Sequence, residues 1–253
     1  MEDKLRKDTK TDIEKSVAKD LEEKKQMVVI KEDKVLDFRF KEAYKTLRAN
    51  LEFAGDDVKV IAVTSCTPNE GKSSVSMNLA KSIAESGKRV ILVDADLRKS
   101  VRMGRIKTGN TRYGLSHFLS GQKSFQDVYC YTNIPNLFMV FAGPVPPNPS
   151  ELLGGKYFRV MIDMLRDFFD YVIIDTPPLG SVIDSAIVAK QCDGSLIVIA
   201  SNEISYKFAQ KIKDQLEKAE CRVIGCVLNK VNINRKSYYG MYYGKYYGKD
   251  YGN

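Results

Sequence analysis

The sequence predicts an α/β fold, in which helices cover both faces of a mostly parallel β-sheet. Short apolar runs rich in Val and Ile recur along the 253-residue chain, and a segment with helical spacing follows most of them. Strands that are apolar at every position are typical of parallel sheets buried on both faces. Ligands of such sheets bind at the carboxyl ends of the strands, so we expect the functional site there.

The elements follow in order from these patterns. A helix is expected over residues 38–54, where apolar side chains recur at helical spacing. The predicted strands lie within residues 58–65, 89–96, 171–178, 194–201 and 221–229. Further helices are expected within residues 71–86, 157–171, 181–191 and 203–218. These elements form one domain over residues 36–230, for which the hydrophobic content of 43% is sufficient.

The two ends of the chain do not share this pattern. Residues 1–35 begin with alternating charges and few apolar positions, which predicts a charged extension or, alternatively, a docking segment derived from an adaptor. Residues 231–253 end in SYYGMYYGKYYGKDYGN, where repeated glycine disfavours both helix and strand, so we expect a flexible tail. Its seven tyrosines are Tyr238, Tyr239, Tyr242, Tyr243, Tyr246, Tyr247 and Tyr251.

Composition limits the setting in which the protein works. The formal charge of +8 suits an anionic ligand, surface or partner. The five cysteines are odd in number and lack metal-ligand spacing, which predicts reduced thiols in a cytoplasmic protein. No apolar stretch approaches the roughly 20 residues that span a bilayer, so recruitment to the inner face of the cell membrane would require a partner.

A phosphate-binding motif follows the first predicted strand. Residues 66–73, CTPNEGKS, match the P-loop pattern G-x-x-x-x-G-K-[ST], except that Cys66 occupies the first glycine position. In such a loop backbone N–H groups cradle the phosphates, Lys72 reaches the β- and γ-phosphates, and the Ser73 hydroxyl binds Mg²⁺. We therefore predict a P-loop NTPase fold with ATP and Mg²⁺ as cofactors. The expected nucleotide contacts are Thr67, Pro68, Asn69, Glu70, Gly71, Lys72, Ser73 and Ser74.

Acidic residues end two further predicted strands. Asp94 and Asp96 follow the apolar run VILV, and Asp175 ends YVIID. A carboxylate at the end of a buried strand is costly unless it is paired or metal-bound. Asp175 is expected to hold Mg²⁺ as a Walker B aspartate, and Asp94 is a second candidate ligand. A carboxylate that accepts a proton would help to phosphorylate a phenol, but the sequence leaves open whether Asp94 or Asp96 does so, or whether both form a helix cap or an ion pair with Arg98.

These motifs together resemble the bacterial tyrosine kinases. The resemblance rests on TPNEGKSS, ILVDADLR and VIIDTPP with the tyrosine-rich C-terminus, and it covers about residues 36–253, including AGPVPPNPSELL at 142–153. It is strongest to the cytoplasmic kinases of Gram-positive capsule and exopolysaccharide systems. It implies an ATP- and Mg²⁺-dependent protein-tyrosine kinase that autophosphorylates its terminal tyrosines in trans, between neighbours in a ring-shaped oligomer. It also assigns catalysis to Lys72 and to Asp94 or Asp96.

The resemblance implies partners and further site residues as well. The family's interface motif E-x-x-R-x-x-R falls on Glu42, Lys45 and Arg48, so a lysine replaces the middle arginine and cannot form its bidentate contact. Asn229 matches an asparagine that contacts adenine in related ATPases. The expected partners are a transmembrane adaptor of the polysaccharide copolymerase type, further copies of this chain in a ring and a cognate tyrosine phosphatase, without nucleic acid.

The main alternative is a switch ATPase of the MinD/ParA type, which shares the P-loop architecture. Those ATPases usually carry a lysine early in the loop, in KGG-x-GK, where Thr67 stands here. A non-enzymatic module whose aromatic tail stacks on nucleic acid is a second alternative, but it leaves the motifs at the strand ends unexplained.

Overall fold

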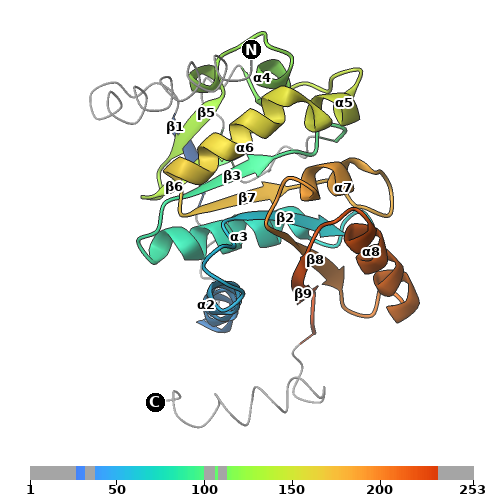
Figure 1. The fold of residues 1–253 in the computed structure, drawn as a ribbon. Helices are drawn as coiled ribbons and strands as arrows, with labels where there is room; N and C mark the ends of the chain where they lie inside the picture. Colours follow the sequence, from blue (N-terminus) through green and yellow to red (C-terminus); the bar gives the residue numbers. More distant parts are fainter. Residues whose placement is uncertain (1–26, 32–37, 100–105, 108–112, 233–253) are drawn as a thin grey trace.

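A single mixed sheet runs through the part of the chain described by the computed structural model, residues 27–31, 38–99, 106–107 and 113–232. The order of its nine strands is β4-β1-β5-β6-β3-β7-β2-β8-β9 (Figure 1). The strands are β1 Met27–Ile30, β2 Val60–Ser65, β3 Val90–Asp94, β4 Ile106–Lys107, β5 Tyr129–Thr132, β6 Leu137–Val140, β7 Tyr171–Asp175, β8 Gly194–Ala200 and β9 Val223–Asn229. All neighbouring strands are parallel except the antiparallel pairs β1–β4 and β5–β6. The predicted, mostly parallel sheet is confirmed.

Helices cover both faces of this sheet, as the sequence predicts. They are α2 Phe38–Glu52, α3 Lys72–Glu85, α4 Leu115–Leu119, α5 Pro149–Gly154, α6 Lys156–Phe168, α7 Asp184–Ala189 and α8 Tyr206–Lys218, with a 3-10 turn at Phe125–Asp127. Buried side chains of α2 and α3 share one apolar core with one face of the central strands. Side chains of α4 to α8 share a second core with the opposite face (Figure 1).

The central strands bring the predicted acidic residues to one edge of the sheet. Every residue of β2, β3 and β7 is buried, because these strands have neighbours on both sides and helices on both faces. Asp94 of β3 pairs in register with Asp175 of β7, and Val63 of β2 also pairs with Asp175. The carboxyl ends of β2, β3 and β7 therefore lie together, where the P-loop begins.

Strand β1 lies within residues 1–35, which the sequence predicts to be a charged extension. It pairs with β5 through Met27 and Tyr131 and through Val28 and Thr132, and it buries Val28 and Ile30. The other predicted features of the termini, including residues 1–26 and the flexible tail with its seven tyrosines, lie outside the described residues.

Two further features concern the cysteines and the character of the helices. All five cysteines are described, and each has a free thiol. Within the described ranges, no helix combines the length and the apolar character needed to cross a membrane.

Candidate active site

The P-loop connects β2 to α3 through a backbone that includes two left-handed residues. Asn69 has a φ of 68° and Gly71 a φ of 92°. A Cβ at Gly71 would lie 2.2 Å from Asn229 Nδ2, so a side chain is excluded there by both φ and space. Gly71 is the N-cap of α3 and has no side chain to accept hydrogen bonds from the first amides of the helix. Those amides remain available to an anion such as phosphate.

Cys66 explains why the loop tolerates a departure from the P-loop pattern. The Cys66 side chain is fully buried in the core shared with α4 to α8. The backbone φ of Cys66 is not positive, unlike those of Asn69 and Gly71. The entry to the loop therefore needs no glycine. Glycine is required instead on the facing segment, because a Cβ at Gly180 would lie 2.2 Å from the carbonyl oxygen of Cys66.

A buried carboxylate, that of Glu70, holds the loop in shape. Its Oε1 accepts hydrogen bonds from the Thr67 backbone N–H and, at 2.9 Å, from the Thr67 hydroxyl. Its Oε2 accepts one from Ala200 N at 2.9 Å, at the end of β8. Asn229 Nδ2 donates to the Glu70 carbonyl oxygen at 2.8 Å. The loop is thus tied to the carboxyl ends of both β8 and β9.

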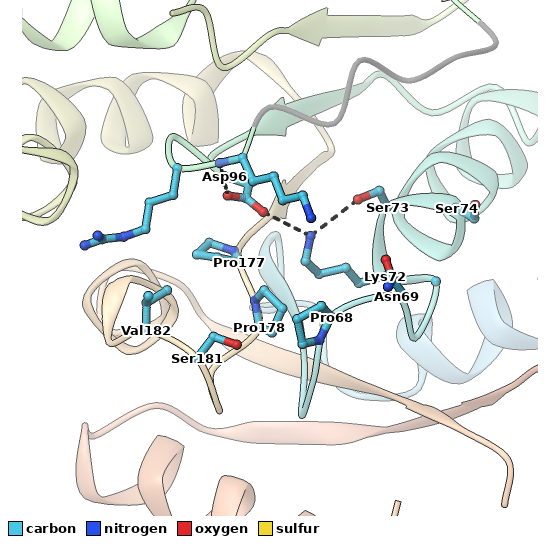
Figure 2. A pocket seen from close by; sticks show the side chains of 13 residues that line it. Pro68, Asn69, Lys72, Ser73, Ser74, Asp96, Pro177, Pro178, Ser181 and Val182 are labelled. Carbon is cyan, nitrogen blue, oxygen red and sulfur yellow. Dashed lines mark hydrogen bonds and ion pairs between the residues drawn. The ribbon is translucent and has the colours of Figure 1, made fainter. Parts of the chain in front are cut away.

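Lys72, Ser73, Asp96 and Asp175 meet at the start of α3. Lys72 Nζ lies 3.4 Å from Asp96 Oδ2, 3.8 Å from Asp175 Oδ1 and 3.5 Å from Ser73 Oγ. Figure 2 shows the lysine between Ser73 and Asp96. All three charged side chains are buried, so their attraction is only weakly screened by solvent. The structure thus brings together side chains that the sequence assigns to three separate motifs.

Asp94 lies behind this group, on the strand beside Asp175. Burial and the neighbouring carboxylate of Asp175 raise the pKa of Asp94 well above its usual range. Burial also raises the pKa of Asp175, although Lys72 and the hydroxyls of Ser73 and Ser76 oppose the shift. The anionic forms of Asp94 and Asp175 are therefore disfavoured unless a further cation binds beside them.

The donor set fits a magnesium ion. In the described part of the chain, no group of three or more His, Cys, Asp or Glu side chains is placed to hold a metal by itself. Mg²⁺ in nucleotide sites is instead bound by one or two carboxylates, a hydroxyl and the phosphates. The Ser73 hydroxyl and the Asp175 carboxylate supply such oxygens at one place, with Asp94 adjacent.

A cavity of about 380 Å³ opens beside these residues. One wall is formed by predicted nucleotide contacts, namely Pro68, Asn69, Gly71, Lys72, Ser73 and Ser74. Thr67, Glu70 and Asn229 do not line it, because they hold the loop from behind. The facing wall consists of Asp96, Arg98, Lys99, Pro177, Pro178, Ser181 and Val182 (Figure 2).

Most of this facing wall is absent from the sequence prediction. Pro177, Pro178, Ser181 and Val182 come soon after the Walker B strand, a position that could have identified them.

The sequence prediction also does not include Asp184. Arg98 Nε and Nη2 donate to the Asp184 carboxylate at 2.7 and 3.0 Å. The alternative in which Arg98 forms an ion pair with Asp94 or Asp96 is therefore wrong, because the Arg98 guanidinium forms its ion pair with Asp184.

The residues predicted to form an oligomer interface make contacts within this chain. Lys45 Nζ donates to Glu42 Oε1 at 2.7 Å on the solvent-facing side of α2. Arg48 Nη1 donates to the Ser82 carbonyl oxygen of α3 at 2.5 Å. Their role between subunits stays a prediction.

We expect Glu70→Ala to weaken ATP binding by about ten- to a hundredfold, because hydrogen bonds to a charged group contribute about 1.5–3 kcal/mol and here they set the loop conformation. Titration with a fluorescent ATP analogue measures this effect. Glu85→Ala, at the exposed end of α3, is the matched control and should bind like the wild type. Unchanged affinity in Glu70→Ala would show that the loop keeps its shape without this carboxylate.

Comparison with known proteins agrees with this geometry. Residues 58–224 match the AAA domain family. The tyrosine-protein kinase CpsD of Streptococcus agalactiae serotype III (strain NEM316) is 42% identical over 210 residues, which cover 81% of this chain and 90% of CpsD. The solved structure of the kinase domain of the Escherichia coli tyrosine kinase ETK has a TM-score of 0.71 and 32% identity, covering 78% of this chain and 79% of that chain.

A more distant ATPase shares the fold at lower sequence identity. MinD, the cell division ATPase of Pyrococcus furiosus, has a TM-score of 0.58 and 24% identity, covering 70% of this chain and 73% of that chain. This likeness shows the common P-loop fold alone. The high coverage and identity to CpsD show the family, and the chain belongs to the bacterial tyrosine kinases.

Proposed function

We propose that this kinase uses ATP to phosphorylate the tyrosines of its own C-terminal tail in trans, and that it regulates capsule or exopolysaccharide synthesis or export. The observation that supports the chemistry best is the convergence of Lys72, Asp96 and Asp175 beside a cavity lined by the P-loop. The tail supplies acceptor phenols at Tyr238, Tyr239, Tyr242, Tyr243, Tyr246, Tyr247 and Tyr251.

The P-loop wall would hold the phosphates. The amides at the start of α3 point their positive ends toward that wall, and Lys72 adds a full charge. Ser73 and Asp175 would hold Mg²⁺, with Asp94 as a further ligand. Bound Mg²⁺ would neutralise the negative charge of the phosphates during transfer.

We assign the role of general base to Asp96 rather than Asp94. Asp96 lines the cavity, whereas Asp94 is not among the lining residues. Asp96 Oδ1 accepts a hydrogen bond from Lys99 N at 3.0 Å, and Oδ2 faces Lys72. Its carboxylate would accept the proton of the tyrosine hydroxyl as the phosphate is transferred, which matters because the free phenol has a pKa of about 10.

The kinase would work at the inner face of the membrane through a transmembrane adaptor of the polysaccharide copolymerase type. The proposed ring would use α2, where Glu42 and Lys45 face solvent. A cognate tyrosine phosphatase would reverse the modification. These proposals rest on the family to which the chain belongs.

Transfer in trans can be tested by separating donor from acceptor. Lys72→Met with an intact tail serves as acceptor only, and a chain without residues 237–253 serves as donor only. After mixing with ATP and Mg²⁺, we expect phosphotyrosine on the Lys72→Met chain. If neither protein is modified while the wild type modifies itself, transfer takes place within one chain.

A further inference from the structure

A three-residue contact joins the loop that carries Asp96 to two helices across the cavity wall. Arg98 Nη2 donates to Ser150 Oγ at 2.8 Å, and Ser150 Oγ donates to Asp184 Oδ1 at 2.6 Å. With the two Arg98–Asp184 hydrogen bonds, the three side chains form a closed triangle. We call Arg98, Ser150 and Asp184 the latch.

The latch connects segments that are distant in sequence. Arg98 follows β3, Ser150 lies in the first turn of α5, and Asp184 is the first residue of α7. Helices α5 and α7 pack on the same face of the sheet (Figure 1). The segment that enters α7 includes Pro178, Ser181 and Val182 of the cavity wall. The latch therefore fixes both sides of the wall that faces the P-loop.

The Asp184 carboxylate is well suited to hold the other latch residues in place. Its side chain is fully buried, whereas 41% of the Arg98 side chain is exposed. Burial opposes ionisation of Asp184, but the hydrogen bonds from Arg98 and Ser150 outweigh it and lower the pKa of Asp184. A buried carboxylate in a bidentate pair with arginine holds its partner in one geometry.

Short backbone contacts connect the latch to Asp96. Lys99 N donates to Asp96 Oδ1 at 3.0 Å, and Asp96 N donates to Asp94 Oδ1 at 3.2 Å. Leu97, between Asp96 and Arg98, is buried in the core. This turn has little freedom while Arg98 is held, so the position of Asp96 depends on the guanidinium two residues later.

We propose that Asp184 and Ser150 are positioning residues, which act through Arg98 to place the Asp96 carboxylate beside Lys72 for transfer to tyrosine. Neither residue lines the cavity or touches the P-loop contacts described above. They should therefore influence the chemical step much more than the binding of ATP. This inference rests on the proposed function, because it assumes that Asp96 acts in the transfer.

The test compares Asp184→Asn and Ser150→Ala with the wild type. We expect kcat for tail phosphorylation to fall at least about tenfold in Asp184→Asn, since a misplacement of about 1 Å can cost a hundredfold, and by less in Ser150→Ala. The Kd for ATP should change less than about twofold. Ser150→Thr, which keeps the hydroxyl, should restore activity. Asp163→Asn, on the exposed face of α6, is the matched control.

Hydrogen exchange measures the mobility of the loop that carries Asp96, and this measurement does not depend on kinase activity. We expect the amides of residues 95–99 to exchange faster in Asp184→Asn and Ser150→Ala, and those of α3 to remain as in the wild type. Unchanged exchange in that loop, or losses of kcat and ATP affinity that simply follow a lower Tm, would overturn the proposal. If the wild type modified no tyrosine, that result would contradict the proposed function. Hydrogen exchange of residues 95–99 would still show whether the latch holds this loop.

Discussion

Lys72→Met is expected to reduce phosphate transfer to the tail by about a thousandfold or more. Lys72 Nζ lies within 4 Å of both Asp96 and Asp175, so its charge is placed where the phosphates would meet the two carboxylates. Removing it takes away a preorganised positive charge among buried side chains, where solvent screens charges only weakly. The initial rate of phosphotyrosine formation, measured with ATP and Mg²⁺, gives the effect.

The same substitution also leaves two buried carboxylates without this cation, so its fold has to be checked separately. A thermal melt of Lys72→Met should still show one cooperative transition, although at a lower Tm. Lys88→Met, at a half-exposed lysine beyond the end of α3, is the matched control and should retain full activity. Substantial transfer by folded Lys72→Met would contradict the role given to this lysine.

Asp96→Asn is expected to lower kcat by about a hundred- to ten-thousandfold, the range typical of a lost general base. Asparagine can still accept the hydrogen bond from Lys99 N, so the turn is preserved while the proton acceptor is removed. ATP affinity should be equal or higher, because a negative charge near the phosphates is lost. Single-turnover kinetics together with nucleotide titration separates these two effects.

Asp94→Asn provides the comparison that distinguishes the two aspartates. Asp94 lies behind the cavity beside Asp175, so its replacement should mainly raise the Mg²⁺ concentration needed for activity. If excess Mg²⁺ restores Asp94→Asn but not Asp96→Asn, the assignment holds. The opposite pattern would make Asp94 the base.

The five longest strands could be predicted because each lies in a largely apolar run. Strands β2, β3, β7, β8 and β9 all lie within the predicted segments. Strands β1, β4, β5 and β6 were missed. They have two to four residues, and such short runs carry no periodic signal of their own. Their pairing partners, not their own sequence pattern, make them strands.

Some residues of the site could likewise be predicted from the sequence and others could not. Lys72 and Ser73 were predictable from one local motif, and Asp96 and Asp175 from their place at strand ends. Ser150 and Asp184 were not, because tertiary packing alone brings them to Arg98, over separations of 52 and 86 residues. The nucleotide contact expected for Glu70 stays a prediction, and the structure turns its carboxylate inward to Thr67 and Ala200. Such a direction depends on neighbouring strands, which the motif does not specify.

Intact mass after incubation with ATP and Mg²⁺ tests the central claim most directly. Three proteins are compared, namely the wild type, Lys72→Met and a chain without residues 237–253. We expect the wild type to gain the mass of several phosphates per chain, and the other two proteins to gain none when incubated alone. Equal mass gains in the wild type and the shortened chain, or steady release of phosphate without any mass gain in the wild type, would contradict a kinase that acts on its own tail.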